Sequence, residues 1–426
     1  MQRTRFHSAC AAAAVAALCG ATASAPAATF NWTNGASGIQ SWDVDSNWDP
    51  PTGFPNASDA TVTVQPNASA ALTIQLNQTI TVNTLTVNDS ATTYYPIDIA
   101  AGTDGKLRLD GPNAAITVGR GAVVSAPIEL LADATLDAGT GNGTISGGIS
   151  GAFSIAKGAG SAALTLAGGT NNTYGGQTEI PNGTLVLGAD NSIPDTSVVD
   201  MSAGPNTRAL SLNGFNTTMA GLTYSTGNAQ ATVRNNHATR ASTLTIRVAP
   251  STSYTFPGSG TSGGIKDGST AALNLVKDGE GTQIISGTKT YTGFTTVKAG
   301  ILDLGSTYNS LASTQINLEG GILDVDGAPY TMAAAQTYQW TLNPARAGGT
   351  GLLKAGSLDI SAGNVTFETV GWLGGATYVL AEYTNLTGSA FATVSNLPAG
   401  AALVYDHEGN KIALIGPPTG AVVVIR

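Results

Sequence analysis

Cysteine is nearly absent from this chain. Its two cysteines, Cys10 and Cys19, both lie close to the N-terminus of the 426-residue sequence. The rest of the chain therefore has no disulfide bond and no thiolate metal site, because both require cysteine side chains. We expect its stability to come from backbone hydrogen bonds and an apolar core instead.

Charged side chains are also scarce. They make up 11% of the residues, and the formal net charge is −9. We expect no nucleic-acid partner and little affinity for anionic lipid, because binding phosphate groups requires clustered lysine and arginine. Apolar residues nevertheless reach 42%, which argues against disorder. With 54 glycines, the composition indicates a folded chain coated with small neutral groups.

Long hydrophobic runs are missing as well. The apolar stretch Ala11–Leu18 follows Arg3 and Arg5, and small residues typical of a cleavage site come after it. This stretch is too short to span a bilayer, so the pattern predicts a signal peptide and export. We expect no transmembrane segment after cleavage. The predicted location is secreted, extracellular or on the cell surface, at the outer envelope of a bacterium.

The most informative feature present is an internal repeat. The segments Ser154–Gly188 and Leu275–Gly305 share glycines, a Thr-Tyr-x-Gly turn and an alternating apolar ending. Seven residues of the first copy match residues of the second that lie 117 positions later. The pairs are Gly176 and Gly293, Thr178 and Thr295, Ile180 and Val297, Gly183 and Gly300, Leu185 and Leu302, Leu187 and Leu304, and Gly188 and Gly305. Such a repeat predicts a fold that stacks copies of one unit.

A finer period lies inside the second copy. Leu302 and Leu304 recur 21 positions later as Leu323 and Val325, each pair alternating with polar residues. Alternation with a return every 20 or so residues is typical of a β-solenoid. Looser rungs of the same kind occur along the chain: Leu72 and Ile74, Leu85 and Val87, Leu107 and Leu109, Ile116 and Val118, Leu164 and Leu166, Leu210 and Leu212, and Leu244 and Ile246. We expect Leu304 to point inward and Thr296 to lie on the exposed outer face.

The turn Thr290–Gly293 and the strand Ala299–Gly305 resemble the units of the autotransporter-associated beta-strand repeat family. The first copy departs from the family pattern, with extra residues before Tyr174 and with Pro181 in its second strand, which predicts a longer turn. The resemblance implies a passenger-like, secreted bacterial β-solenoid and a right-handed helix. It covers the two repeat units, the tryptophan-rich opening and the C-terminal segment.

We therefore predict an all-β protein, a right-handed parallel β-helix with an N-terminal aromatic cap and an antiparallel C-terminal cap. The expected division is a signal peptide at 1–28, a tryptophan-rich cap at 29–70, a β-solenoid at 71–370, a capping β segment at 371–416 and a tail at 417–426. Within the solenoid, the repeat units are expected at 152–188 and 273–305.

The opening of the mature chain concentrates tryptophan. Trp32, Trp42 and Trp48 lie within 17 residues of one another. Large rings bury the open first coil of a solenoid efficiently, so we interpret these residues as an N-terminal cap. The alternative is carbohydrate binding, because an indole face stacks on a sugar ring.

Two carboxylates are expected to form an outer column. If Leu302 and Leu323 point inward, Asp303 and Asp324 point outward on successive coils, about 4.8 Å apart. Two like charges at this short distance repel each other. A pair of carboxylates can bind Ca²⁺ when further oxygen donors are near. The sequence thus offers a Ca²⁺ site at Asp303 and Asp324, with a solvated acidic patch as the alternative. No other cofactor is suggested.

Little in the sequence points to catalysis. His7 lies in the predicted signal peptide, and His237 and His407 lie in turn-like contexts. We expect a non-enzymatic structural or adhesion-type protein, whose partners are extracellular polysaccharide or other cell-surface proteins. The competing hypothesis is a carbohydrate-active β-helix that binds polysaccharide or cleaves it as a lyase or glycosidase. A groove rich in aromatic and charged residues would favour the latter, and a uniform exterior of Thr, Ser, Asn and Gly the former.

Overall fold

The computed structural model describes residues 28–90, 95–139, 141–202, 206–224, 230–257, 263–307, 310–346, 348–371 and 374–416. The predicted signal peptide up to residue 27, with its cysteines and His7, and the C-terminal tail lie outside these residues. Within them the chain forms 44 strands and two short 3-10 helices, η1 (Asp45–Asn47) and η2 (Gly169–Asn171). No helix of the described part is long and apolar enough to cross a membrane.

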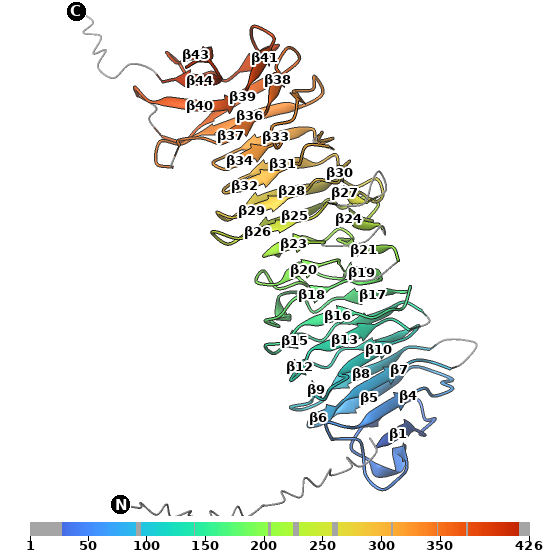
Figure 1. Cartoon of the computed structure of the whole chain (residues 1–426). Coiled ribbons are helices and arrows are strands. Elements are labelled where there is room, and N and C mark those ends of the chain that lie inside the picture. The colour runs from blue at the N-terminus through green and yellow to red at the C-terminus, as the bar shows by residue number, and fades with distance from the viewer. Residues whose placement is uncertain are drawn as a thin grey trace, which may run out of the picture.

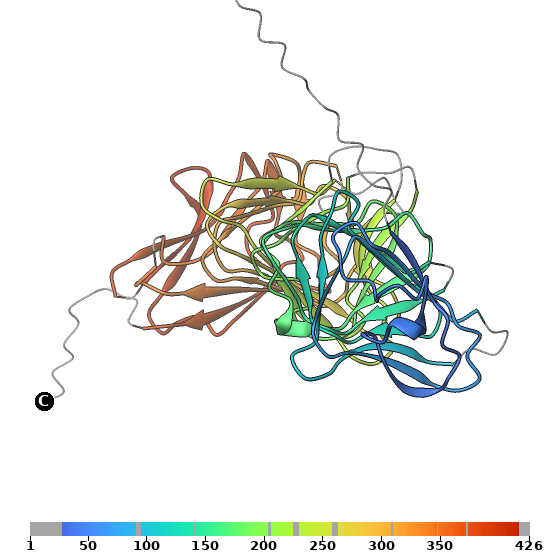
Figure 2. The ribbon, with the colours of Figure 1, turned by 90° about the horizontal axis from the view of Figure 1, so that it is seen from below.

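The strands wind into an elongated parallel β-solenoid of about 12 turns. Figure 1 shows the chain climbing from the N-terminal to the C-terminal end of a rod. Figure 2 shows the same ribbon from below, with the C-terminal coils displaced to one side of the N-terminal coils. The predicted all-β solenoid is confirmed.

Each coil presents strands on up to three faces. The first face carries a 10-stranded and an 8-stranded sheet, which meet where the Tyr224 amide donates to the Thr255 carbonyl over 3.0 Å. The strands of the 10-stranded sheet are, in spatial order, β3 (Trp48–Asp49), β1 (Thr29–Trp32), β4 (Thr61–Val64), β7 (Thr84–Val87), β10 (Ala115–Val118), β13 (Ala134–Asp137), β16 (Ile155–Lys157), β18 (Thr178–Glu179), β20 (Val198–Asp200) and β23 (Gly221–Thr223). Those of the 8-stranded sheet are β26 (Ser253–Thr255), β29 (Thr282–Ile284), β32 (Ile301–Asp303), β34 (Ile322–Asp324), β37 (Leu352–Lys354), β40 (Thr377–Glu382), β44 (Lys411–Ile415) and β43 (Ala402–His407).

The second face carries an 11-stranded and a 3-stranded sheet, linked where the Ala312 amide donates to the Lys289 carbonyl. The longer sheet consists of β2 (Gly38–Ser41), β5 (Leu72–Leu76), β8 (Ile97–Ala101), β11 (Ala122–Val124), β14 (Gly143–Ile145), β17 (Ala163–Leu166), β19 (Gly183–Leu187), β21 (Arg208–Ser211), β24 (Ala231–Asn235), β27 (Gly264–Asp267) and β30 (Thr288–Lys289). The shorter sheet consists of β35 (Tyr330–Thr331), β38 (Ser357–Asp359) and β41 (Asn385–Thr387).

The third face carries a 4-stranded and an 8-stranded sheet. The first consists of β6 (Thr79–Val82), β9 (Lys106–Leu109), β12 (Ile128–Leu130) and β15 (Ile149–Ser150). The second consists of β22 (Thr217–Met219), β25 (Ser242–Arg247), β28 (Leu273–Asp278), β31 (Phe294–Val297), β33 (Gln315–Leu318), β36 (Thr337–Leu342), β39 (Asn364–Thr369) and β42 (Thr393–Ser395). Between these two sheets the coils stack through irregular backbone: the Thr173 amide donates to the Ile149 carbonyl, and the Asn191 amide to the Asn216 carbonyl.

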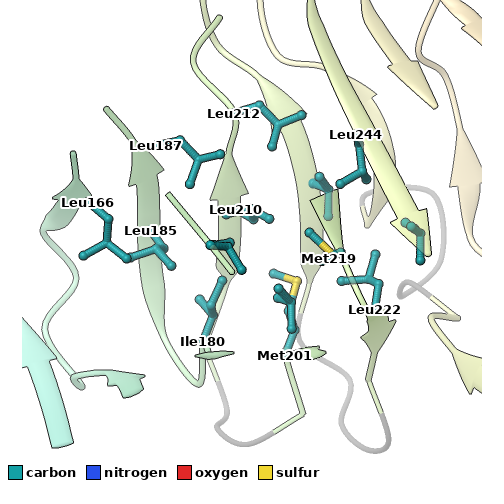
Figure 3. Packing of buried hydrophobic residues seen from close by; sticks show 14 of the residues in the cluster. Leu166, Ile180, Leu185, Leu187, Met201, Leu210, Leu212, Met219, Leu222 and Leu244 are labelled. Atoms are coloured by element: carbon teal, nitrogen blue, oxygen red, sulfur yellow. The ribbon is translucent and has the colours of Figure 1, made fainter. Parts of the chain in front are cut away.

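Alternation of side chains builds one continuous core. Leu302 lies opposite Leu323 in register, and each is 0% exposed, while their neighbours in the chain point outward. All the looser rungs predicted from the sequence are likewise buried. Figure 3 shows one stretch of this core, in which Leu166 lies opposite Leu187 and Leu185 lies opposite Leu210 on neighbouring coils. Each fully buried leucine contributes roughly 1.5–3 kcal/mol of transfer free energy. Each coil buries only a few such side chains, but many coils stack, so their contributions add up along the rod.

The glycine before the second strand of each repeat copy is required by its backbone. Gly183 and Gly300 have φ values of 68° and 62°, a region that favours glycine. A Cβ on Gly183 would lie 2.6 Å from the Gly160 carbonyl oxygen, and one on Gly300 would lie 2.3 Å from that of Gly281. The shared glycines therefore mark corners where neighbouring coils nearly touch.

Antiparallel pairs close both ends. At the N-terminus β3 pairs antiparallel with β1, and at the C-terminus the hairpin β43–β44 pairs antiparallel with β40. The limits 29–70 and 371–416 of the two caps stay predictions. Parallel pairing already joins β1 to β4 and continues as far as β42, so the antiparallel C-terminal part is the hairpin alone.

Candidate functional site

The two repeat copies build the same buried hydroxyl chain. The Tyr174 hydroxyl lies 2.6 Å from Thr178 Oγ1, which lies 2.9 Å from Ser197 Oγ. In the second copy the Tyr291 hydroxyl lies 2.7 Å from Thr295 Oγ1, which lies 2.6 Å from Ser313 Oγ. All six side chains are buried. The serine in each case belongs to the next coil, so the turn tyrosine ties two coils together.

Burial changes the acidity of these tyrosines. Desolvation raises the pKa of Tyr291 to about 12, and it raises the pKa of Tyr174 as well. Both phenols therefore stay protonated at any physiological pH and serve as hydrogen-bonding groups rather than as general bases.

Three lysines point into the coil and bind backbone carbonyls. Lys277 Nζ donates to the carbonyls of Asp278, Gly279 and Ala299 at 2.7 to 3.1 Å. Lys289 Nζ donates over the same range of distances to those of Ile285, Gly287 and Leu304. Lys157 Nζ donates to the carbonyls of Gly158 and Gly160 and forms an ion pair of 2.8 Å with Asp137.

Burial also lowers the pKa of two of these amines. Desolvation brings the pKa of Lys277 to about 8, and that of Lys289 to about 7. The sequence analysis did not identify these residues, because a lysine in a polar, glycine-rich corner is expected to be exposed to solvent. The signal available in the sequence was the Gly-x-Gly segment beside Lys157 and the glycines that follow Lys277.

The three N-terminal tryptophans are buried against one another. Trp32, Trp42 and Trp48 are 6%, 0% and 1% exposed. The ring centroids of Trp42 and Trp48 are 4.7 Å apart, and those of Trp32 and Trp48 are 5.0 Å apart. Their indole N–H groups donate to the carbonyls of Asn34, Pro55 and Trp42. This is the packing that a cap requires, and it leaves little ring surface for stacking on a sugar.

Asp303 and Asp324 lie in register on β32 and β34, as the sequence predicts. Burial, followed by repulsion from Asp324 and Asp326, raises the pKa of Asp303. Asp324 is in register with Lys354 on the next coil, and its carboxylate lies 4.0 Å from the ammonium group. The column continues through Glu382 and Lys411, so its charges alternate after the first pair.

Both aspartates also close their own turns. Asp303 Oδ1 accepts the Gly305 amide over 2.7 Å, and Asp324 Oδ1 accepts the Asp326 amide over 3.0 Å. These are Asx turns at strand ends, a structural use of the side chain. Among the described residues there is no group of three or more His, Cys, Asp or Glu side chains placed to hold a metal ion.

A second acidic pair was missed by the sequence analysis. Glu179 on β18 and Asp200 on β20 are in register on the first face, 21 positions apart. Burial raises the pKa of Glu179, and the charges of Asp200 and Asp133 add to the effect. The signal available in the sequence was the 21-residue spacing, which the flanking apolar residues Ile180 and Met201 share.

One of the two described histidines lies in a loop, and the other is the last residue of a strand. His237 Nδ1 accepts the amides of Thr239 and Arg240, which closes the loop after β24. His407 ends β43, 3.9 Å from the carboxylate of Glu408. The structure does not bring them together with each other or with the acidic pairs into one site.

Part of the outer side of the 8-stranded sheet on the third face is uncharged over seven coils. Two columns of side chains, in register from β25 to β42, make up this surface, which we call the neutral face. Its members are Thr243, Asn274, Phe294, Gln315, Thr337, Asn364 and Thr393 in one column, and Thr245, Val276, Thr296, Asn317, Gln339, Thr366 and Ser395 in the other.

Thr296 corrects one sequence expectation. It points outward as predicted, but it is only 4% exposed. Asn317 Nδ2 on the next coil donates to its hydroxyl over 3.0 Å. Outward direction on a tightly stacked sheet therefore does not imply exposure, and the prediction that Thr296 is exposed was wrong.

The hollows on the described part of the rod have mixed polar and apolar linings. One of about 420 Å³ lies on the third face, where the 4-stranded sheet gives way to the 8-stranded sheet, and it is lined by Thr173, Asp195, Thr218 and Arg247 among others. Its Arg247 lies 3.4 Å from Asp195 and 3.3 Å from Asp278. Another, of about 450 Å³, lies beside β41 and the C-terminal hairpin.

These features define a class, a repeat-built β-solenoid whose polar groups mostly join one coil to the next. Residues 159–192 and 275–304 match the family model described as passenger-associated-transport-repeat. With the solenoid fold, these two matches fit an autotransporter passenger-like repeat protein. Searches of curated proteins and of solved structures returned no match.

Proposed function

We propose that this protein is a secreted or cell-surface β-solenoid with a structural or adhesive role and no catalytic activity. The observation that carries the proposal is the use of outer polar side chains in bonds between coils. On the neutral face, Asn317, Gln315 and Gln339 bond to side chains of neighbouring coils. A surface that links its own coils stiffens a rod, and a rod holds a binding surface away from the cell.

The match to a passenger-type repeat supports an extracellular location, because passengers are exported segments. The predicted signal peptide agrees with this. The absence of cysteine after Cys19 in the sequence also suits a protein that needs no oxidative folding step.

The test is to express the full chain in a Gram-negative host and to treat intact cells with protease. We expect the protein in the medium or digested on intact cells, while a cytoplasmic marker survives. The purified protein is expected to release no product from pectin, alginate or glucans. Retention inside the cell would contradict the proposed location, and turnover of any of these polymers would contradict the non-catalytic role.

A carbohydrate-active β-helix is the second candidate function. The observation that favours it is the pair Glu179 and Asp200, since two carboxylates on one face with one raised pKa suit glycoside cleavage. The hollow beside Glu179 measures about 210 Å³. Turnover that disappears in Glu179→Gln, with thermal stability unchanged, would establish this alternative.

A further inference from the structure

The two columns of the neutral face carry no charge, unlike the outer column of the first face that contains Asp303 and Asp324. On the first face, the column through Asp303, Asp324 and Lys354 is charged. On the neutral face none of the fourteen residues carries a charge, over a length of about 30 Å for seven strands. Charged residues border the two columns: Arg247, Asp278 and Glu368 lie at the ends of their strands, and Asp267 lies at the opposite edge, where it accepts the amides of Leu273 and Thr292. A polyanion finds no row of cations here.

The amide groups of this face are held in place. Gln315 Nε2 donates to Asn317 Oδ1 over 2.7 Å and to Gln339 Oε1 over 3.1 Å. Gln339 Nε2 in turn donates to Glu368 Oε2 over 2.8 Å. Side chains that are already ordered lose little conformational entropy when a ligand binds. Amides and hydroxyls in fixed positions match a ligand that is itself rich in hydroxyl groups.

One aromatic ring stands on this face. Phe294 on β31 is 37% exposed, between Asn274 and Gln315 in its column. Asn274 Oδ1 accepts the Phe294 amide over 3.1 Å, which holds the backbone under the ring. An exposed ring among neutral polar groups can stack on the apolar face of a sugar while its neighbours bind the hydroxyls.

We propose that the neutral face binds a neutral polysaccharide laid across the coils, with Phe294 stacking on one sugar ring. The inference rests on the proposed adhesive role and names its ligand class. Affinity comes from one ring contact and several hydrogen bonds that replace bonds to water, so each interaction is weak and the length of the face adds them together.

The test is affinity electrophoresis and calorimetry of the full chain with laminarin and mannan as neutral probes and alginate as an anionic probe. We expect binding to at least one neutral probe and none to alginate. Phe294→Ala should weaken binding about tenfold, and Asn317→Asp should also weaken it by breaking the amide network. Phe153→Ala is the matched control, because Phe153 is also 37% exposed but lies outside the face, and it should bind as the unaltered protein does.

Thermal melts followed by circular dichroism show for each variant whether weaker binding comes from a change at the neutral face or from unfolding of the protein. The inference is overturned if no neutral probe binds, if alginate binds instead, or if Phe294→Ala and Phe153→Ala bind equally. Self-association that Phe294→Ala abolishes without any glycan would assign the face to a second copy of the chain. Each of these results leaves the protease test of surface location unaffected, so the two proposals fail separately.

Discussion

Thr178 and Thr295 occupy the same place in the two repeat copies, yet they lie on different faces of the rod. Thr178 is on β18 of the first face, and Thr295 is on β31 of the third. Each makes the same short contact with a turn tyrosine, 2.6 Å from Tyr174 and 2.7 Å from Tyr291. The repeat therefore specifies a corner and two strands. The corner forms the same Tyr–Thr contact on either face of the rod.

The tyrosine chains are expected to stabilise both copies equally. Tyr291→Phe leaves the buried hydroxyls of Thr295 and Ser313 with one partner fewer, which costs roughly 1–2 kcal/mol. Tyr174→Phe should cost a similar amount. The double variant should show the sum of the two shifts in urea unfolding, because the sites share no partner. A double variant no worse than either single one would contradict this.

The core assignment predicts a large effect at Leu304. This side chain is 0% exposed, so Leu304→Asp places an unpaired carboxylate between coils and should destabilise the protein by several kcal/mol. Thr337→Asp, at an exposed position on β36, is the control and should change the melting temperature little. Equal thermal shifts would overturn the assignment of inner and outer faces.

Lys289 predicts a rise of stability with pH. In the unfolded chain a lysine titrates near pH 10.5, whereas burial lowers the pKa of Lys289 to about 7 in the fold. Between these values the unfolded state binds more protons, so the free energy of unfolding increases with pH. The contribution of Lys289 to the free energy of unfolding is therefore greatest above about pH 10.5, and it is lost as the pH falls through 7.

Lys289→Met should reduce that slope between pH 7 and 9 in chemical unfolding, and the remainder should come from Lys277, whose pKa burial lowers to about 8. Lys298→Met changes an exposed lysine nine positions away and should keep the slope. A slope as steep in Lys289→Met as in the unaltered protein would show that other groups produce it.

The N-terminal cap predicts local protection. Trp42 is 0% exposed and its centroid lies 4.7 Å from that of Trp48. Trp42→Ala leaves a cavity in the cap and should speed proteolysis near the N-terminus more than elsewhere. If tryptophan fluorescence responded to glucan or pectin while proteolysis stayed unchanged, the three rings would be a sugar site instead of a cap.

For the acidic column we expect no response to calcium. Lys354 faces Asp324, and both Asp303 and Asp324 already accept backbone amides. Millimolar Ca²⁺ should therefore leave the melting temperature unchanged. A rise with Ca²⁺ that Asp324→Asn abolishes would identify a cation site.

Much of the fold could be predicted because its rules are local. The pairing of Leu302 with Leu323 followed from alternation and a 21-residue return, and the structure has that register. The candidate sites were less predictable. Glu179 and Asp200 obey the same spacing, but only the winding shows that they share a face. Thr296 points outward as alternation requires, and a neighbouring coil then covers it.

By itself the sequence determined which apolar side chains point inward, where the corners require glycine, and that the unit repeats, because each depends on backbone geometry over a few residues. Tertiary structure alone decided which residues stack in columns. Thr245 lies opposite Val276, 31 positions on, whereas Val276 lies opposite Thr296, only 20 positions on. Because the coils differ in length, the number of residues between stacked partners changes from coil to coil, and no single sequence period predicts it. The neutral face, the buried lysines and the alternating charges after Asp324 all arise from that stacking.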